Sequence, residues 1–229
     1  MRASAIIVAA GGGTRLGANG PKAFVRVAGR AMLSYSLEAI AGTSEIGEVV
    51  VAVPAGFEPQ ARAQVDAAKL KLPVKITPGG RERQDSVRIA LELVSAEAEV
   101  VVVHDAARPF APPELVQACI EAARREGAAI AAVPVSDTLK RVDGGAVVAT
   151  VTRAGLWQAQ TPQAFRRDLL VAAHRRAAEK KLSATDDADL VEQAGGKVVI
   201  VETSGVNIKV TTPADLLIAA AVAASIRKR

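Results

Sequence analysis

The sequence predicts an α/β protein built on a doubly wound, mostly parallel β-sheet. Half of the 229 residues are apolar but only 3% are aromatic, a composition typical of aliphatic parallel strands covered by helices on both faces. Short apolar runs also alternate along the chain with segments of helical periodicity, which is the pattern of βαβ units with right-handed crossovers. Ligands of such sheets bind beyond the carboxyl ends of the strands, so functional residues are expected there.

Six runs have the length and composition of buried strands, and six segments between them have helical spacing. We predict strands at residues 5–9, 48–53, 74–77, 100–104, 129–135 and 197–202. We predict helices at residues 31–41, 57–68, 83–94, 113–126, 167–181 and 187–194.

One segment breaks this alternation. Two alternating runs, 138–142 and 146–151, flank the turn sequence Asp143-Gly144-Gly145, which is a β-hairpin signal. A two-stranded arm of this length cannot bury both faces on its own domain, so we expect it to pack on a second subunit or to fold over the active site. No internal repeat or linker divides the chain, so we expect a single domain over residues 1–229.

Charge, hydropathy and cysteine content exclude several classes of partner. The formal net charge is +5, but three of the surplus positive residues are the terminal 227–229 and no basic run is interleaved with aromatic residues; we therefore expect no nucleic-acid partner. The apolar run 216–225 is shorter than the roughly 20 residues that a bilayer requires, and the run 5–10 opens into a glycine loop, which favours a buried strand over a secretory signal. We expect a cytoplasmic protein with no membrane partner.

The single cysteine, Cys119, allows no internal disulfide or cysteine-based zinc cluster, and its spacing favours a small buried side chain.

A glycine-rich loop, AAGGGTRLGANGPK, follows the first predicted strand at residues 9–22. Its glycines allow the backbone to approach a ligand and to point successive N–H groups at phosphate oxygens. A dinucleotide-binding oxidoreductase would share this feature, but the glycine spacing differs and no acidic residue ends the second strand, which runs into Pro54. A P-loop is excluded because no GK[ST] follows.

Two cations, Arg15 and Lys22, lie seven residues apart on this loop. On their own they would be interpreted as solvated surface charges. Beside a phosphate-binding turn they favour nucleotidyl or phosphoryl transfer, because such reactions depend on cations placed against the charge that spreads over the reacting phosphate.

Two further motifs follow predicted strands. HDAARP, residues 104–109, places Asp105 at the carboxyl end of the most apolar strand, where a hard carboxylate ligand suits Mg²⁺ and a loop cap is the alternative. Strand alternation points His104 to the opposite side, so we interpret it as structural. GGRERQDSV, residues 79–87, is a turn leading into a helix; its N–H groups and Ser86 could contact a base or ribose, and a plain helix start is the alternative.

Seven motifs in order resemble those of the 2-C-methyl-D-erythritol 4-phosphate cytidylyltransferases of the non-mevalonate isoprenoid pathway. Running from residue 9 to 216, they are AAGxGxR with a downstream PK, GGxxRxxSV, HDAARP, DTLK, QTPQxF, TDDA and NIKxTxPxDL. The resemblance implies a Rossmann-like fold of the nucleotidyltransferase and glycosyltransferase-A-like kind. It also implies transfer of CMP from CTP to methylerythritol phosphate with Mg²⁺, and a homodimer held by the β-arm at about residues 136–160.

The resemblance also implies roles for individual residues. Cations that stabilise the transition state at the α-phosphate are Arg15 and Lys22, and those that hold the acceptor phosphate are Arg153 and Lys209. The implied nucleotide contacts are Ala9, Ala10, Gly11, Gly13, Gly80, Ser86 and Ala106. The implied smaller contributors to the acceptor pocket are Arg108, Thr138, Thr161 and Thr185, and the implied metal ligand is Asp105.

The sequence departs from the family pattern at a few positions, and two alternative functions remain open. Arg81 stands where the family often has an acidic residue, which could change contacts to the cytosine or ribose, and Leu16 replaces the usual Met. A cytidylyltransferase acting on ribitol 5-phosphate would share the glycine loop. A catalytically silent scaffold would be expected to lose the phosphate-facing cations, yet Arg15, Lys22 and Lys209 are present.

Overall fold

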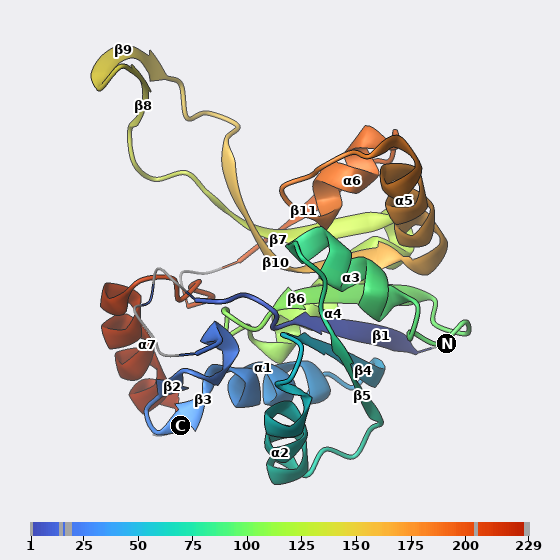
Figure 1. Cartoon of the computed structure of the whole chain (residues 1–229). Coiled ribbons are helices and arrows are strands. Elements are labelled where there is room, and N and C mark those ends of the chain that lie inside the picture. The colour runs from blue at the N-terminus through green and yellow to red at the C-terminus, as the bar shows by residue number, and fades with distance from the viewer. Residues whose placement is uncertain (1, 14–15, 17–19, 204–205, 227–229) are drawn as a thin grey trace.

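A seven-stranded sheet forms the centre of the molecule in the computed structural model, which describes residues 2–13, 16, 20–203 and 206–226 (Figure 1). The strand order is β11-β7-β10-β6-β1-β4-β5. In chain order the strands are β1 (Ala3–Val8), β4 (Ile46–Val53), β5 (Val74–Pro78), β6 (Val100–Asp105), β7 (Ala128–Pro134), β10 (Trp157–Arg166) and β11 (Val199–Glu202).

The sheet is mixed but mostly parallel, which confirms the predicted α/β class. Strands β6, β1, β4 and β5 are parallel neighbours, and β11 is parallel to β7. The exception is β10, which is antiparallel to both β6 and β7. This strand was not predicted, because Pro162 and three glutamines interrupt its apolar pattern. The pairing of β10 with β7 shifts register between Ala159 and Gln163, so Pro162 lies where the ladder is already irregular.

Helices cover both faces of the sheet, as the alternation of strand side chains requires. Ile7 and its neighbours pack under α1 (Met32–Ala41), α2 (Glu58–Ala68) and α4 (Pro113–Glu126). Ile6, one residue earlier on β1, packs on the opposite face under α3 (Arg83–Leu91), α5 (Arg167–Lys180) and α6 (Asp187–Gln193). Both isoleucines are fully buried, and such burial stabilises the fold by about 1.5–3 kcal/mol per side chain. Cys119 is buried within α4, and burial raises the pKa of its thiol to about 12, which confirms its interpretation as a packing residue.

A last helix, α7 (Pro213–Ile226), packs against a third, smaller cluster. Ala219 and Ala223 face that cluster, whereas Leu217 and Ile218 are 76% and 53% exposed. The sequence has an apolar run here that is too short to span a bilayer, but no helix was predicted from it. Among the described residues, none of the helices has the length and hydropathy needed to cross a bilayer.

Two short strands, β2 (Arg26–Val27) and β3 (Arg30–Ala31), follow the short 3₁₀ helix η2 (Lys22–Phe24) near the first turn of α1.

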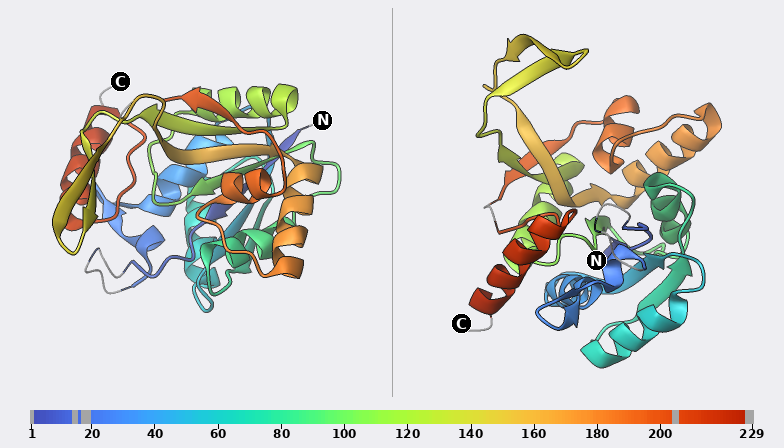
Figure 2. Two further views of the ribbon diagram at one scale, coloured as in Figure 1. Left: turned by 90° about the horizontal axis from the view of Figure 1, so that it is seen from above. Right: turned by 60° about the vertical axis from the view of Figure 1, so that its left-hand side comes forward.

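The predicted hairpin is confirmed as a separate two-stranded sheet. Strands β8 (Leu139–Asp143) and β9 (Ala146–Val151) pair antiparallel and join at a turn where Gly144 and Gly145 both have positive φ, the conformation that favours glycine in two-residue hairpin turns. Figure 2 shows this arm extending away from the central sheet and its helices. Hereafter "the arm" denotes residues 136–160, which include the hairpin and its two connections to β7 and β10.

Candidate active site

A cavity of about 430 Å³ lies beyond the carboxyl ends of β1 and β6, the edge at which ligands of parallel sheets bind. Its wall is built from the glycine loop after β1, the turn before α3, the end of β6 and the segment before α7. The lining residues are Val8, Ala9, Ala10, Gly11, Gly12, Gly13, Lys22, Ala23, Gly80, Arg81, Glu82, Arg83, Ser86, Asp105, Ala106, Ala107, Lys209 and Thr211. A larger cavity of about 600 Å³ lies between η2, β3, α1 and α2, but it includes only Gly20 and Pro21 of the glycine-rich loop.

A backbone hydrogen bond joins the end of the glycine loop to its start. The Lys22 amide donates to the Gly11 carbonyl at 3.2 Å, which brings Lys22 back to the start of the loop. Gly13 has a φ of +72°, and a Cβ there would lie 3.0 Å from the Lys22 Cβ, so both the conformation and the space require glycine. Lys22 therefore lines the cavity together with the predicted nucleotide contacts of this loop. Arg15, the other predicted catalytic cation of the loop, lies outside the described residues.

The turn before α3 packs tightly against the same loop. A Cβ on Gly80 would lie 2.2 Å from the Asp85 Cβ, and one on Gly79 would lie 2.5 Å from the Ala10 Cβ. The buried Ser86 hydroxyl accepts from the Gly80 amide at 3.1 Å and donates to the Glu82 carbonyl at 3.0 Å. Through these bonds Ser86 stabilises the turn. Its contact with a nucleotide stays a prediction.

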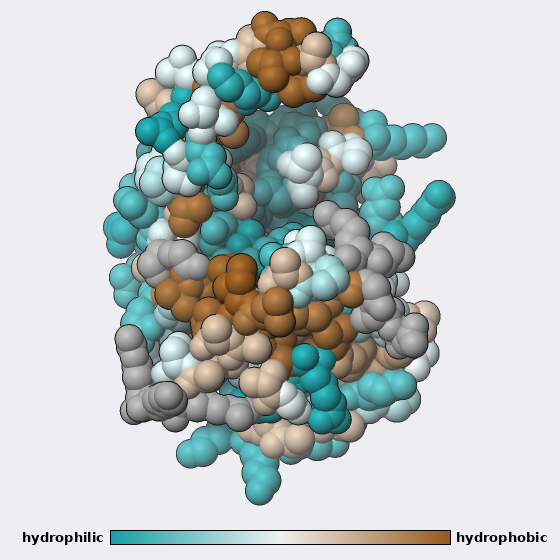
Figure 3. Space-filling model, turned by 90° about the vertical axis from the view of Figure 1, so that its left-hand side faces the viewer, coloured by the Kyte–Doolittle hydropathy of each residue, from teal (hydrophilic) through white to brown (hydrophobic). Residues whose placement is uncertain are grey.

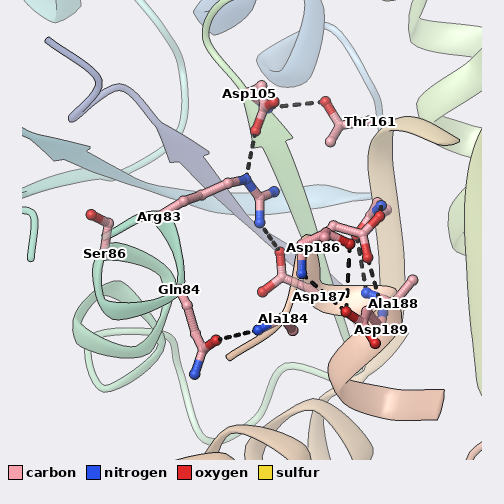
Figure 4. Close-up of polar contacts among 12 residues, drawn as sticks. Arg83, Gln84, Ser86, Asp105, Thr161, Ala184, Asp186, Asp187, Ala188 and Asp189 are labelled. Atoms are coloured by element: carbon pink, nitrogen blue, oxygen red, sulfur yellow. Dashed lines mark hydrogen bonds and ion pairs between the residues drawn. The ribbon is translucent and has the colours of Figure 1, made fainter. Parts of the chain in front are cut away.

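Asp105 is held between two cations at the end of β6. Its Oδ1 accepts from Arg83 Nε at 3.0 Å (Figure 4). Its Oδ2 accepts from Lys209 Nζ at 2.7 Å. Burial alone would raise the pKa of this carboxyl, but the charges of Arg83 and Lys209 outweigh burial and hold the pKa well below its ordinary value. Asp105 is therefore a carboxylate throughout the neutral pH range.

His104, the preceding residue, faces away from the cavity, as strand alternation predicted. It is fully buried, and its two ring nitrogens lie 2.9 Å from the Arg108 carbonyl and 3.2 Å from the Thr161 hydroxyl. Burial lowers its pKa to about 4, so the ring is neutral near pH 7. Its structural interpretation is confirmed.

Two of the predicted acceptor residues lie behind Asp105. The Thr161 hydroxyl accepts from the Asp105 amide at 3.0 Å, and the buried Arg108 donates from Nη1 to the Asn207 carbonyl at 2.8 Å. Burial lowers the pKa of Arg108. Neither lines the cavity, so in this chain both support the backbone that carries Asp105 and Lys209.

The remaining predicted acceptor residues are not gathered at the cavity. Thr138 and Arg153 are exposed on the arm, where Arg153 Nη1 donates to the Ser136 carbonyl. Thr185 is exposed before α6, and its amide donates to the Asp189 carboxylate at 3.0 Å. None of the three is among the residues that line the cavity in the single chain.

Sequence reasoning missed the residues that anchor the site from within. Arg83 bridges Asp105 and the buried Asp187, to which its Nη1 donates at 2.7 Å. Gln163 of β10 donates at 2.7 Å to Asp186, the N-cap of α6. The signal was available, since Arg83, Gln163 and Asp187 are fixed letters of the GGxxRxxSV, QTPQxF and TDDA motifs; only their partners were invisible in the sequence.

Comparisons with known proteins agree with one another. The family profile of 2-C-methyl-D-erythritol 4-phosphate cytidylyltransferase matches residues 3–225. The cytidylyltransferase of that name from Deinococcus radiodurans is 48% identical over 96% of this chain and 89% of its own length. The one from Bacillus licheniformis is 40% identical over 97% of this chain and 96% of its own length.

A solved structure extends the similarity to three dimensions. The crystal structure of 2-C-methyl-D-erythritol 4-phosphate cytidylyltransferase from Thermus thermophilus superposes with a TM-score of 0.83 at 41% identity, and the match covers 98% of this chain and 100% of that one. The ordered motifs, the cavity at the carboxyl edge of the sheet and these similarities lead to the same assignment. The chain belongs to the family of 2-C-methyl-D-erythritol 4-phosphate cytidylyltransferases.

Proposed function

We propose that the chain catalyses its family's reaction in the cavity beyond β1 and β6. As a member of the family it is a cytidylyltransferase: it transfers CMP from CTP to 2-C-methyl-D-erythritol 4-phosphate, giving 4-diphosphocytidyl-2-C-methyl-D-erythritol and pyrophosphate in non-mevalonate isoprenoid synthesis. The observation that carries the placement is the opposition, across one cavity, of a glycine loop bearing Lys22 and a Lys209–Asp105 pair. One side suits the triphosphate and the other suits the acceptor phosphate.

The nucleotide end is formed by the loop after β1. Backbone N–H groups of such a loop bind phosphate oxygens without a side chain. Lys22 then neutralises charge that develops at the α-phosphate, and Arg15 is proposed for the same role. The lining residues Ala10, Gly80 and Ala106 present small surfaces to the cytidine; these contacts are supported by the cavity's shape and by the matching motif positions.

The acceptor end is formed by Lys209, whose side chain is 42% exposed at the cavity. An ammonium group there can bind the phosphate of the acceptor and hold it for in-line attack. Arg153 of the arm is proposed as its partner. Thr138 and Thr185 are proposed as smaller contacts, and Arg108 and Thr161 as supports from behind.

The reaction needs no general base. A phosphate monoester has a second pKa of about 6 and is already largely dianionic at neutral pH. An acceptor oxygen attacks the α-phosphorus of CTP, the bond from that phosphorus to the bridging oxygen breaks, and pyrophosphate leaves with the electron pair. The residues around the cavity agree with such a mechanism, because the nearest histidine, His104 of β6, is buried, neutral and directed away from the cavity.

A magnesium ion fits the chemistry of the cavity. Among the described residues, no cluster of three or more His, Cys, Asp or Glu side chains is placed to hold a metal, but Mg²⁺ in nucleotide sites commonly takes one or two carboxylates and completes its shell with phosphates and water. Asp105 keeps its negative charge, and each of its oxygens has one partner although it can accept more than one bond. We propose Asp105 as the ligand; the ion, when bound, would neutralise charge on the triphosphate.

The arm is proposed to hold a homodimer. Val142, Val147 and Val148 at its tip are 56%, 62% and 57% exposed, and α7 exposes Leu217 and Ile218 on the same side of the molecule. Figure 3 shows hydrophobic side chains gathered at both places. A two-stranded arm has no core of its own, so a second copy that covers these surfaces would also bring Arg153 and Thr138 to a neighbouring cavity.

The assignment is tested by measuring pyrophosphate release. The protein is incubated with Mg²⁺, each of the four nucleoside triphosphates, and either methylerythritol phosphate or ribitol 5-phosphate. We expect release only with CTP and methylerythritol phosphate. Release with CTP and ribitol 5-phosphate instead would move the acceptor to the alternative, and no release with any combination would contradict the assignment as an active transferase.

A further inference from the structure

A row of side chains with alternating charge runs from the cavity into the protein interior. It begins at Lys209, continues through Asp105 and Arg83, and ends at Asp187 and His174. The four contacts measure 2.7, 3.0, 2.7 and 2.9 Å in that order. Figure 4 shows Arg83 reaching from α3 between Asp105 and Asp187.

The inner end of this row is rigidly held. Asp187 is 1% exposed and His174 is 2% exposed, whereas the Lys209 side chain is 42% exposed. Asp187 is the first residue of α6, and the turn that leads into α6 is tied to two other elements. Gln163 of β10 donates to Asp186 at 2.7 Å, and the Gln84 side chain of α3 accepts from the Ala184 amide at 3.2 Å. Asp187 is therefore a fixed point against which Arg83 is placed.

Charge balance makes each member depend on the next. A buried carboxylate without partners is strongly unfavourable, and Asp187 is held by the Arg83 guanidinium and by the His174 ring. Arg83 cannot turn wholly to Asp105 while Asp187 holds its Nη1, and it therefore engages Asp105 through Nε alone. That leaves Asp105 Oδ2 for Lys209. Asp187 in the interior is thus linked to the Lys209 ammonium at the acceptor end through Arg83 and Asp105.

We propose that Arg83 and Asp187 are positioning residues for the acceptor phosphate, acting through Asp105 and Lys209. Neither residue is among the predicted substrate contacts. The inference rests on the proposed function, because it assigns the effect to the acceptor end of that site. It predicts that a change of charge at the interior Asp187 alters acceptor binding more than CTP binding.

The test compares Asp187→Asn with Asp168→Asn. Asn is isosteric with Asp and keeps a hydrogen-bond acceptor for Arg83, so the fold is disturbed as little as the loss of charge allows. Without the Asp187 charge, Arg83 shifts toward Asp105, and the contact between Asp105 and Lys209 weakens. We expect KM for methylerythritol phosphate to rise about tenfold, several times more than KM for CTP, which changes only through the proposed metal ligand Asp105. Asp168 lies exposed on α5, the helix that carries His174, and caps the adjacent Leu169 amide; its variant should keep both KM values.

A second variant covers the case in which Asp187→Asn does not fold. Arg83→Lys keeps the positive charge but cannot reach both carboxylates at once, so it should give the same split between the two KM values. A merely structural role would lower kcat through the folded fraction and leave both KM values unchanged. Unchanged KM for methylerythritol phosphate in the folded variants, or an equal rise in both KM values, would overturn the inference. The proposed function is judged separately, by the wild-type protein and Lys209→Ala.

Discussion

Lys22 is tied to the start of the glycine loop through its backbone. Its amide is bonded to Gly11 and its Cβ lies against the position that only glycine can occupy at residue 13. The residue types in the loop predict a phosphate site, and this stays a prediction. The sequence could not show that residues 11 and 22 meet, because that contact closes the loop through hydrogen bonds between main-chain atoms.

Replacing Lys22 by Ala should lower kcat on the order of 100-fold, as removal of one oxyanion donor does in other enzymes. The loss should appear in kcat because the cation acts on charge that develops in the transition state. Steady-state kinetics with both substrates measures this, and Lys69→Ala, on the C-cap of α2, is the matched control. Near wild-type kcat for Lys22→Ala would remove Lys22 from the mechanism.

Two glycines of the cavity should respond differently to the same added methyl group. Gly80→Ala places a Cβ 2.2 Å from the Asp85 Cβ, so the turn must move and stability should fall by roughly 1–3 kcal/mol. Gly11→Ala meets nothing within 4 Å, so stability should be kept while the methyl group crowds the phosphate and raises KM for CTP. Urea unfolding and kinetics on both variants separate the two effects; equal stability loss in both would contradict this account of the loop.

At the scale of elements, the sequence predicted the helices and strands whose apolar residues follow one periodicity throughout. Helix α4 was predicted at its observed residues, 113–126, because its apolar spacing and its final Gly127 agree. Strand β10 was missed because Pro162 and Gln163 read as a loop, and their reasons for being there are tertiary: Gln163 binds the start of α6. Arg83 was missed as a site residue for a similar reason, since its two partners lie 22 and 104 residues away.

Helix α7 was missed although its start signal is legible in the sequence. Thr212 and Asp215 form a capping box, and Pro213 is the first residue of the helix. Thr212 Oγ1 accepts from the Asp215 amide at 3.3 Å, and the Asp215 carboxylate accepts from the Thr212 amide at 2.8 Å. The long apolar run after it was interpreted only as too short to span a bilayer. The residues were sufficient to predict this helix.

Asp215→Asn should destabilise α7 by about 1 kcal/mol near pH 7. Hydrogen bonds from Thr211 and Thr212 lower the pKa of Asp215 to about 2. A lowered folded-state pKa means that its contribution is complete above the unfolded pKa of about 4 and disappears as the pH falls toward 2. Urea unfolding of both proteins at pH 7 and pH 3 should therefore show the difference shrinking in acid. A difference independent of pH would argue against this cap.

At the scale of the whole molecule, the arm is the feature that a single chain does not account for. It exposes valines at its tip, carries two of the proposed acceptor residues, and contributes nothing to the cavity of its own chain. The hairpin itself was predicted from its turn sequence. The partner that covers the hairpin could not be predicted from the residues, because the sequence of a surface patch is the same whether the patch faces solvent or another chain.

Charging the tip should separate a homodimer into single chains. Val147→Asp together with Val148→Asp would place carboxylates in the proposed interface, and light scattering should then report about half the mass of the wild-type particle. Glu58→Ala, on the remote helix α2, is the control for altered surface charge. A wild-type protein of single-chain mass, or a double variant that stays paired, would contradict the proposed role of the arm.

The central claim is that the cavity beyond β1 and β6 holds CTP with its triphosphate against the glycine loop. A crystal structure of the protein with CTP tests it most directly. We predict phosphate oxygens within hydrogen-bond distance, about 3 Å, of the loop amides and of Lys22 Nζ, with the cytidine beside Gly80 and Ala106. CTP bound elsewhere, with Lys22 directed into solvent, would contradict the claim.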